Sequence, residues 1–170
     1  GLSLLSDSKY GCRGDEHSLN ISLLRASSGP DKYPEIGERR FRIGLSACDD
    51  APMALKELGE QFAHRDLPYV SNTAHTGTLP LTDRFFTVNG DVTVSCVKQA
   101  EYADDAFVIR LASVYNDRPV DASICFTADV TTVEAVDLAE QPISSDVTLN
   151  DHTASVSLKP GQSVTLLVRR

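Results

Sequence analysis

The sequence has 170 residues, a formal net charge of -8 and a pI of about 4.9. This length allows one ordinary domain, or two small ones, with a real hydrophobic core. The acidic balance argues against a nucleic-acid backbone or an anionic membrane surface as partner, because both require clustered Lys and Arg. The sequence also has no apolar run of about 18 residues, the length that a membrane-spanning helix needs.

The first half of the chain predicts strands interrupted by one short helix. Alternating apolar residues at 19–24 and 40–45 are typical of half-buried strands. Residues 51–65 predict the helix, because Pro52 suits a first turn and apolar residues then recur on one face, at Leu55, Leu58 and Phe62. The chain begins with the strand-like GLSLL, which suggests a fragment of a longer protein.

The second half predicts a series of short strands, which follows a stretch of linker composition at 65–83. Turn-forming residues separate the predicted strands, which cover 84–88, 92–100, 106–115, 120–126, 131–138, 146–150, 153–158 and 163–170. In the third of these, Phe107, Ile109 and Leu111 share one face, and Val108 and Arg110 share the other. This spacing predicts an all-β fold of antiparallel sandwiches with one short helix, divided into domains 1–82 and 84–170.

The residue types of metal and nucleophile sites occur without the spacing that such sites need. The four cysteines are not in CxxC or Cys/His spacing, so we expect no structural zinc site and four reduced thiols in an intracellular protein, with Cys96 and Cys125 buried among apolar strand residues. The histidines, His17, His64, His75 and His152, show no HxH or HxxxH spacing. Composition and pattern alone therefore predict a soluble β-sandwich protein without a self-contained active site.

Two polar clusters at predicted strand ends are the candidate ligand sites. The first contains Asp7, Lys9 and Tyr10, within SDSKYG, and the second contains Arg25 and Asp31. Charged side chains at the mouth of a sandwich can bind a hydroxylated ligand through charge-assisted hydrogen bonds. The same residues can also be solvated strand ends, and the pattern leaves both interpretations open.

These clusters lie in the part of the sequence that resembles a known enzyme family. The segments GLSLLSDSKYG, LNISLLRASSGPD and GERRFRIGL, in this order, resemble the C-terminal region of glycoside hydrolase family 38, the class II α-mannosidases, in its intracellular branch. Looser similarity continues through ALKELGEQFAHRDLPYV and FFTVNGDVTVSCVKQAEYADDAFVIRL to VSLKPGQSVTLLVR, so that it covers essentially the whole chain.

The resemblance implies that the chain is a non-catalytic part of a cytoplasmic enzyme. The family's retaining hydrolysis of terminal α-mannosides uses two carboxylates and a zinc ion of an N-terminal barrel domain, so it implies no catalytic or metal-binding residue here and no activity of this chain alone. Residues 1–82 would complete a large β-sandwich, a β-supersandwich, and 84–170 would form a small terminal sandwich. Both would pack on the barrel and the preceding β-domain of the same chain.

The resemblance also implies which side chains could reach the sugar pocket. By position, Arg25, with Asp31 nearby, maps to an arginine that the family's β-region lends to the pocket rim. The family motif is also matched by Asp7, Lys9 and Tyr10. For these residues, the resemblance is compatible with contact to a ligand and with a structural role. The alternative is a stand-alone carbohydrate-binding or structural β-sandwich without enzymatic role, which titration with mannose would distinguish.

Overall fold

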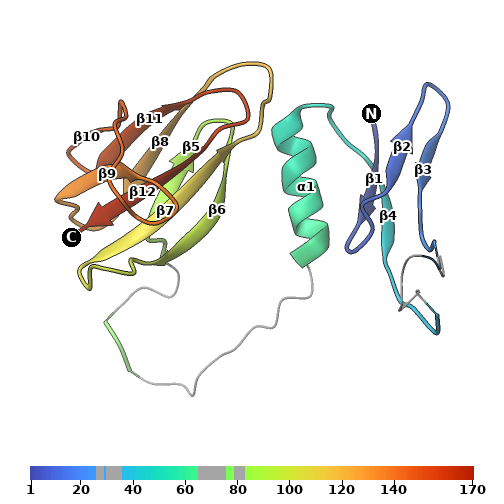
Figure 1. The fold of residues 1–170 in the computed structure, drawn as a ribbon, viewed down its shortest axis with the longest axis horizontal. Coiled ribbons are helices and arrows are strands. Elements are labelled where there is room, and N and C mark those ends of the chain that lie inside the picture. The colour runs from blue at the N-terminus through green and yellow to red at the C-terminus, as the bar shows by residue number, and fades with distance from the viewer. Residues whose placement is uncertain (26–28, 30–35, 65–75, 79–82) are drawn as a thin grey trace. The chain divides into compact units, whose positions relative to one another are not determined.

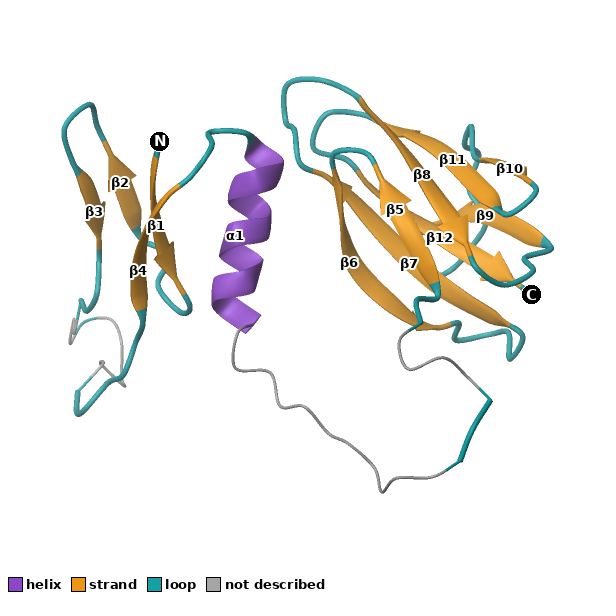
Figure 2. Ribbon diagram, turned by 180° about the vertical axis from the view of Figure 1, so that it is seen from behind, coloured by secondary structure: helices purple, strands orange, loops and turns teal. Residues whose placement is uncertain are grey.

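The computed structural model describes all residues except 26–28, 30–35, 65–75 and 79–82. Its chain separates into two compact units, Gly1–Asn72 (unit 1) and Thr73–Arg170 (unit 2). Strands in antiparallel sheets dominate both units, and α1 is the one helix of the described residues (Figures 1 and 2). The predicted fold class, all-β and antiparallel with one short helix, is confirmed. The predicted domain limits, 1–82 and 84–170, stay a prediction.

Unit 1 contains two separate two-stranded antiparallel sheets and the helix. One sheet pairs β1 (Leu2–Ser6) with β4 (Ile43–Ala47), and the other pairs β2 (Cys12–Gly14) with β3 (Leu19–Ile21). The helix α1 spans Pro52–His64, as the sequence predicts. None of the described residues of unit 1 is buried. The described part of unit 1 therefore has strands but no closed core.

The helix α1 packs on one face of the β1–β4 sheet. A Cβ atom at Gly44 would lie 2.8 Å from the ring of Phe62, so this strand position needs glycine for the aromatic ring to approach. Phe62 and Leu58 are half-buried, whereas Leu55, on the same predicted face, is exposed. The sheet's other face carries Leu4 paired with Leu45 and has no helix on it.

Unit 2 is a sandwich of two four-stranded antiparallel sheets (Figure 1). The first sheet has the order β10-β11-β8-β5, with bounds Thr148–Asn150, Thr153–Leu158, Val120–Phe126 and Phe86–Asn89. The second has the order β6-β7-β12-β9, with bounds Val92–Gln99, Ala106–Ser113, Ser163–Arg169 and Thr132–Val136. All eight strands lie within the predicted ranges or one residue beyond them, because turn residues separate them as the sequence indicates.

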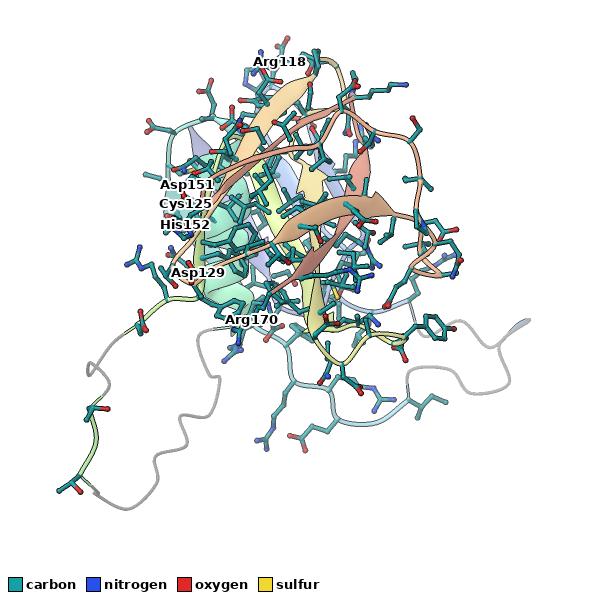
Figure 3. The ribbon with its side chains drawn as sticks, turned by 90° about the vertical axis from the view of Figure 1, so that its left-hand side faces the viewer. Arg118, Cys125, Asp129, Asp151, His152 and Arg170 are labelled. Atoms are coloured by element: carbon teal, nitrogen blue, oxygen red, sulfur yellow. The ribbon has the colours of Figure 1, made fainter. Side chains whose placement is uncertain are left out.

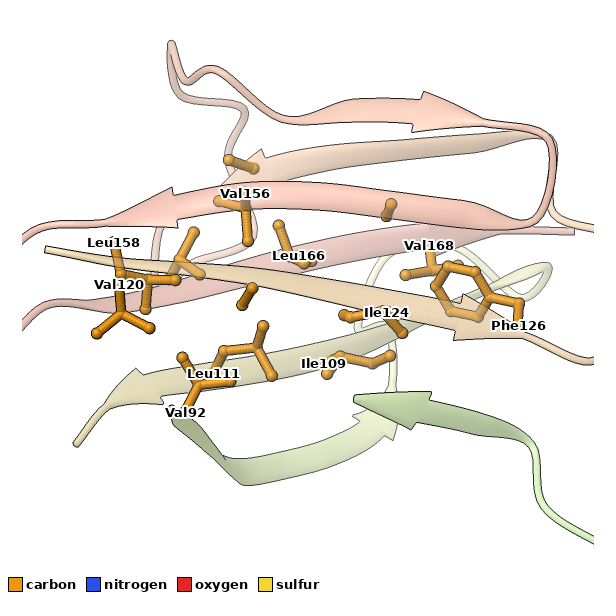
Figure 4. Close-up of a cluster of buried hydrophobic side chains, with 14 residues drawn as sticks. Val92, Ile109, Leu111, Val120, Ile124, Phe126, Val156, Leu158, Leu166 and Val168 are labelled. Carbon is orange, nitrogen blue, oxygen red and sulfur yellow. The ribbon is translucent and has the colours of Figure 1, made fainter. Parts of the chain in front are cut away.

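The core of unit 2 lies between its two sheets. Figure 4 shows the side chains that meet there, among them Ile109 and Leu111 from β7, Ile124 from β8 and Leu166 from β12. These four are fully buried. The predicted inward face of β7 is therefore confirmed for Ile109 and Leu111, and Phe107 packs against this core while partly exposed.

The outer face of the second sheet has a smaller apolar cluster that the alternation did not predict. Val108 is fully buried and packs with Ala106, Val136 and Leu167. Ala100 and Ala103 of the β6–β7 loop pack against this cluster, and an ion pair of 2.6 Å joins Lys98 of β6 to Glu140, which follows β9. The central strands β7 and β12 are thus buried on both faces.

The expected burial of two cysteines is wrong. Cys125 is exposed and Cys96 is half-buried, although both are free thiols like Cys12 and Cys48. Residues along a strand alternate between faces, and the core takes Ile124 and Phe126, so Cys125 lies on the outer face. All four cysteines are free in the structure, and their reduced state in an intracellular protein stays a prediction.

Candidate functional site

The SDSKYG segment forms a turn that joins the end of β1 to the residue before β4. The Asp7 carboxylate accepts a hydrogen bond of 2.9 Å from Arg42 Nε and one of 3.1 Å from the Arg42 backbone amide. The Ser8 hydroxyl donates to the same carboxylate at 2.9 Å, and the Asp7 amide donates to the Arg42 carbonyl oxygen. Asp7 therefore holds the end of β1 next to the beginning of β4 and fixes the register of this pair.

This arrangement lowers the pKa of the Asp7 carboxyl below its usual value of 3.8. The hydrogen bond from the Arg42 backbone amide is the main cause, followed by the Ser8 hydroxyl and then by the Arg42 side chain, while partial desolvation opposes the shift. Asp7 is therefore charged at neutral pH. Its acceptor oxygens are already occupied by protein donors, which suits a structural contact better than a general acid.

The other two residues of this cluster differ from Asp7 in their surroundings. The Lys9 backbone amide donates to the Ser6 hydroxyl at 2.9 Å, and Lys9 Nζ lies 5.5 Å from the centre of the Phe41 ring, within cation–π range. Tyr10 is exposed, and its carbonyl oxygen accepts from the Cys12 amide. Of the three predicted site residues, Tyr10 presents the most side-chain surface to a ligand.

The second predicted cluster is described only in part. Arg25 lies four residues after the end of β3 and is exposed, and Asp31 lies outside the described residues. Asp7 and Arg25 follow strands of different sheets, β1 and β3. A ligand-binding role of Arg25, Asp31, Asp7, Lys9 and Tyr10 stays a prediction.

Sequence reasoning missed Arg42, the ion-pair partner of Asp7. The signal was present in the order of the strands, because Ser6 pairs with Ile43, so the residue after β1 must face the residue before β4. Recognising the pair requires knowing that β1 and β4 are neighbours, and they are separated by two other strands in the chain.

A cluster of titratable residues in unit 2 forms around His152 (Figure 3). Its Nε2 atom lies 3.6 Å from Asp151 Oδ1 and 3.9 Å from Asp129 Oδ1, and both carboxylates are exposed. The His152 carbonyl oxygen accepts from the Phe126 amide, which places His152 beside Phe126 and leaves Cys125 on the opposite face of the sheet. This geometry does not provide the thiol–imidazole contact of a catalytic cysteine.

Metal binding has no support in the part of the chain that the structure describes. Among these residues, no group of three or more His, Cys, Asp or Glu side chains is placed to hold a metal ion. Within the same residues, no helix has the length and apolar character needed to cross a membrane.

Comparison with known proteins relates unit 2 to a family of enzymes. The pattern described as "Glycosyl hydrolases family 38 C-terminal beta sandwich domain" matches residues 91–166, from the residue before β6 to the middle of β12. The predicted resemblance to glycoside hydrolase family 38 is confirmed. The matched residues lie in unit 2, the part of the chain that has a closed core.

Three curated relatives extend the similarity over the remaining chain. Alpha-mannosidase 2C1 of Homo sapiens is 29% identical over 99% of this chain, and the protein of the same name from Mus musculus is 28% identical over 99%. Alpha-mannosidase G of Dictyostelium discoideum is 25% identical over 65%. The chain spans only 16% of the length of the human and mouse proteins. These relatives are named α-mannosidases, and this chain corresponds to a small part of each.

Proposed function

We propose that this chain is the non-catalytic C-terminal β-region of a retaining, zinc-dependent α-mannosidase. The observation that carries the proposal is the alignment of 99% of the chain with 16% of two α-mannosidases. Hydrolysis of terminal α-mannosides is then a property of the whole parent enzyme. The zinc and the two catalytic carboxylates would belong to the barrel outside these residues, so we derive no catalytic step from this chain.

The open core of unit 1 supports a role in packing against other parts of that enzyme. Leu2 and Leu45 lie on the sheet face without the helix and are 62% and 68% exposed. Burying such side chains contributes roughly 1.5–3 kcal/mol each, and a two-stranded ribbon alone is marginal in water. We infer that strands of the preceding β-domain cover this face, so that residues 1–82 complete a β-supersandwich.

The polar turn after β1 has a defined place in this proposal. Asp7 and Arg42 hold the strand ends, while the exposed Tyr10 and Arg25 are the side chains that could be lent to the rim of a sugar pocket formed mainly by the barrel. The free state of all four cysteines supports a cytoplasmic location, where thiols stay reduced.

The test compares the isolated chain with the parent enzyme on an aryl α-mannoside in the presence of zinc. We expect turnover by the parent and none by the purified 170-residue chain. A parent truncated to end before this region should lose activity, because its supersandwich would lack strands. Turnover by the isolated chain, or full activity of the truncated parent, would contradict the proposal.

The alternative, a stand-alone carbohydrate-binding or structural module, makes a different prediction for the isolated chain. Such a module would bind mannose or mannobiose in calorimetric titration without the barrel. For a pocket that lacks its barrel wall, we expect no binding of millimolar or tighter affinity.

A further inference from the structure

The strand β6 is an edge of the second sheet of unit 2 and carries apolar side chains that its own sandwich leaves exposed. Among the described residues, it pairs with β7 and with no other strand. Val97 pairs with the core residue Ile109 and thus lies on the core side of the sheet, yet it is 54% exposed. The opposite sheet ends in β5, which has four residues where β6 has eight. The sandwich is therefore open along β6.

The backbone of β6 has hydrogen-bonding groups that point away from the sheet. The Ala100 amide donates to the Ala106 carbonyl oxygen, so these two residues form a hydrogen-bonded pair of the antiparallel ladder. Because hydrogen-bonded and non-hydrogen-bonded pairs alternate, the amides and carbonyls of Val97 and Gln99 face the open edge. These groups can pair with an added strand.

A bulge divides β6 into a protected half and an open half. The register with β7 shifts between Val94 and Cys96, and such a bulge twists an edge strand away from new partners. The half after the bulge, Cys96–Gln99, has no such protection. Lys98 could also guard the edge by its charge, but its ammonium is engaged by Glu101 at 2.7 Å and Glu140 at 2.6 Å.

The open half of β6 borders a groove of about 620 Å³. Its lining includes the apolar Phe85, Val97 and Phe107. The charged residues that line it are Lys98, Asp104, Asp105 and Arg170. Asp105 lies 3.7 Å from Arg169. Among the described residues, Lys98, Asp105 and Arg170 have charged or aromatic partners, whereas the Asp104 carboxylate has no ion-pair partner. The groove thus combines an apolar lining, a free strand edge and one carboxylate, which together fit an extended peptide with an apolar side chain and a nearby cation.

Two other occupants fit the groove less well. A sugar would need the exposed face of an aromatic ring, but the Arg170 guanidinium lies 4.5 Å from the centre of the Phe85 ring. A second copy of the chain would add another net charge of -8, so two copies would repel each other. By contrast, the human and mouse relatives have most of their length outside the matched region, since this chain spans 16% of each.

We propose that an extended segment of the parent enzyme, outside these 170 residues, adds to β6 at Cys96–Gln99 and fills this groove with an apolar side chain. The segment carries a Lys or Arg that faces Asp104. This inference rests on the proposed function, because it takes the chain to be part of a longer α-mannosidase. In this proposal, the extended segment is the partner of unit 2, and the edge of β6 with its groove is the surface that binds it.

Amide hydrogen exchange, measured on both the isolated chain and the parent enzyme, tests the inference. In the isolated chain, the amides of Val97 and Gln99 should exchange rapidly. In the parent, their exchange should be slower by a factor of about ten or more. Val97→Lys in the parent should remove this protection, since a charge would enter the apolar groove. The same substitution should leave the melting temperature of the isolated chain within about 2 °C of wild type, because the side chain is exposed there.

Leu138→Lys is the matched control, because Leu138 is 80% exposed and does not line the groove. It should leave exchange at Val97 and Gln99 unchanged in the parent. Equal exchange of these two amides in the parent and the isolated chain would overturn the inference. Protection that rises with the concentration of the isolated chain would overturn it in favour of a second copy. Hydrolysis of an aryl α-mannoside by the same wild-type parent preparation tests the proposed function separately.

Discussion

Truncating Leu166 should destabilise unit 2 strongly, because the whole side chain lies in its core. Leu166 is 0% exposed and is paired with Ile109 on β7 and Ala135 on β9. Replacing a fully buried Leu by Ala removes its burial energy and leaves a cavity between rigid sheets, at a cost of roughly 3–5 kcal/mol. This cost is a large part of the about 5–15 kcal/mol that stabilises a typical domain.

The magnitude converts into a melting temperature that is simple to measure. Unit 2 has about 100 residues, and for a domain of this size each kcal/mol lowers the melting temperature by about 4–8 °C. The Leu166→Ala variant of the 170-residue chain should therefore melt about 12 °C or more below wild type. Far-UV circular dichroism would follow the thermal transition. The matched variant, Leu138→Ala, removes the same atoms from a side chain that is 80% exposed and should shift the transition by only about 2 °C.

Equal melting temperatures of the two leucine variants would refute the reasoning, because the two-sheet core would then not determine the stability of unit 2. Amide exchange gives a second measurement of the same quantity. Exchange in β7 and β12 should accelerate in Leu166→Ala, and exchange in the strands of unit 1 should not, since they lie outside this core.

Three further predictions concern a turn, a charge and a proposed ligand contact. Gly90→Ala should lower the free energy of unfolding by about 2 kcal/mol or more, because φ is +109° and a Cβ atom would lie 2.4 Å from the Asp121 carbonyl oxygen. As its control, Gly59→Ala in α1 places a Cβ atom where no atom of another part of the chain lies within 4 Å, and should raise the free energy of unfolding by about 1 kcal/mol. Arg42→Ala should speed amide exchange in β1 and β4 at pH 7. In the parent enzyme, Arg25→Ala should lower kcat/KM about tenfold or more, as expected for a lost charge-assisted contact.

The pH dependence of the Arg42 effect follows from the lowered pKa of Asp7. The ionised carboxylate stabilises the fold above its usual pKa of 3.8, and this contribution disappears as the pH falls through the lower pKa of the folded state. Wild type and Arg42→Ala should therefore differ at pH 7 and converge in strong acid. A difference that is the same at both pH values would show that Arg42 acts through packing.

Unchanged kinetics in a folded Arg25→Ala parent would remove Arg25 from the site.

The strands of unit 2 could be predicted because local signals agree there. Alternating apolar residues mark β8 and β11, and turn residues such as those around Gly90 and Gly161 separate the strands. The helix was likewise visible in its apolar spacing. The exposed Cys125 was not predicted correctly, because an apolar neighbourhood in the sequence does not say which residues of the strand face the core.

The candidate sites depend on strand neighbours that the sequence does not reveal. Asp7 and Arg42 meet only because β1 and β4 pair, and the β6 groove exists only because Phe85, Val97 and Phe107 come from three parts of the chain. The phenylalanines are also spread along the sequence, from Phe41 to Phe126. In unit 2, however, Phe85, Phe86, Phe107 and Phe126 form edge-to-face pairs at 4.9–6.4 Å, which brings them to one end of the sandwich.

The two units differ in how much of their own stability they can supply. Unit 2 encloses Ile109, Leu111 and their neighbours between two sheets, so its strands gain enough burial to offset the entropy of ordering them. Unit 1 orders its strands around Gly44 and Phe62 without burying any described residue. The Asp7–Arg42 pair can set the register of this ribbon, but a half-exposed ion pair contributes too little to hold it. Under the proposed function, the burial that stabilises unit 1 comes from the preceding β-domain of the parent enzyme.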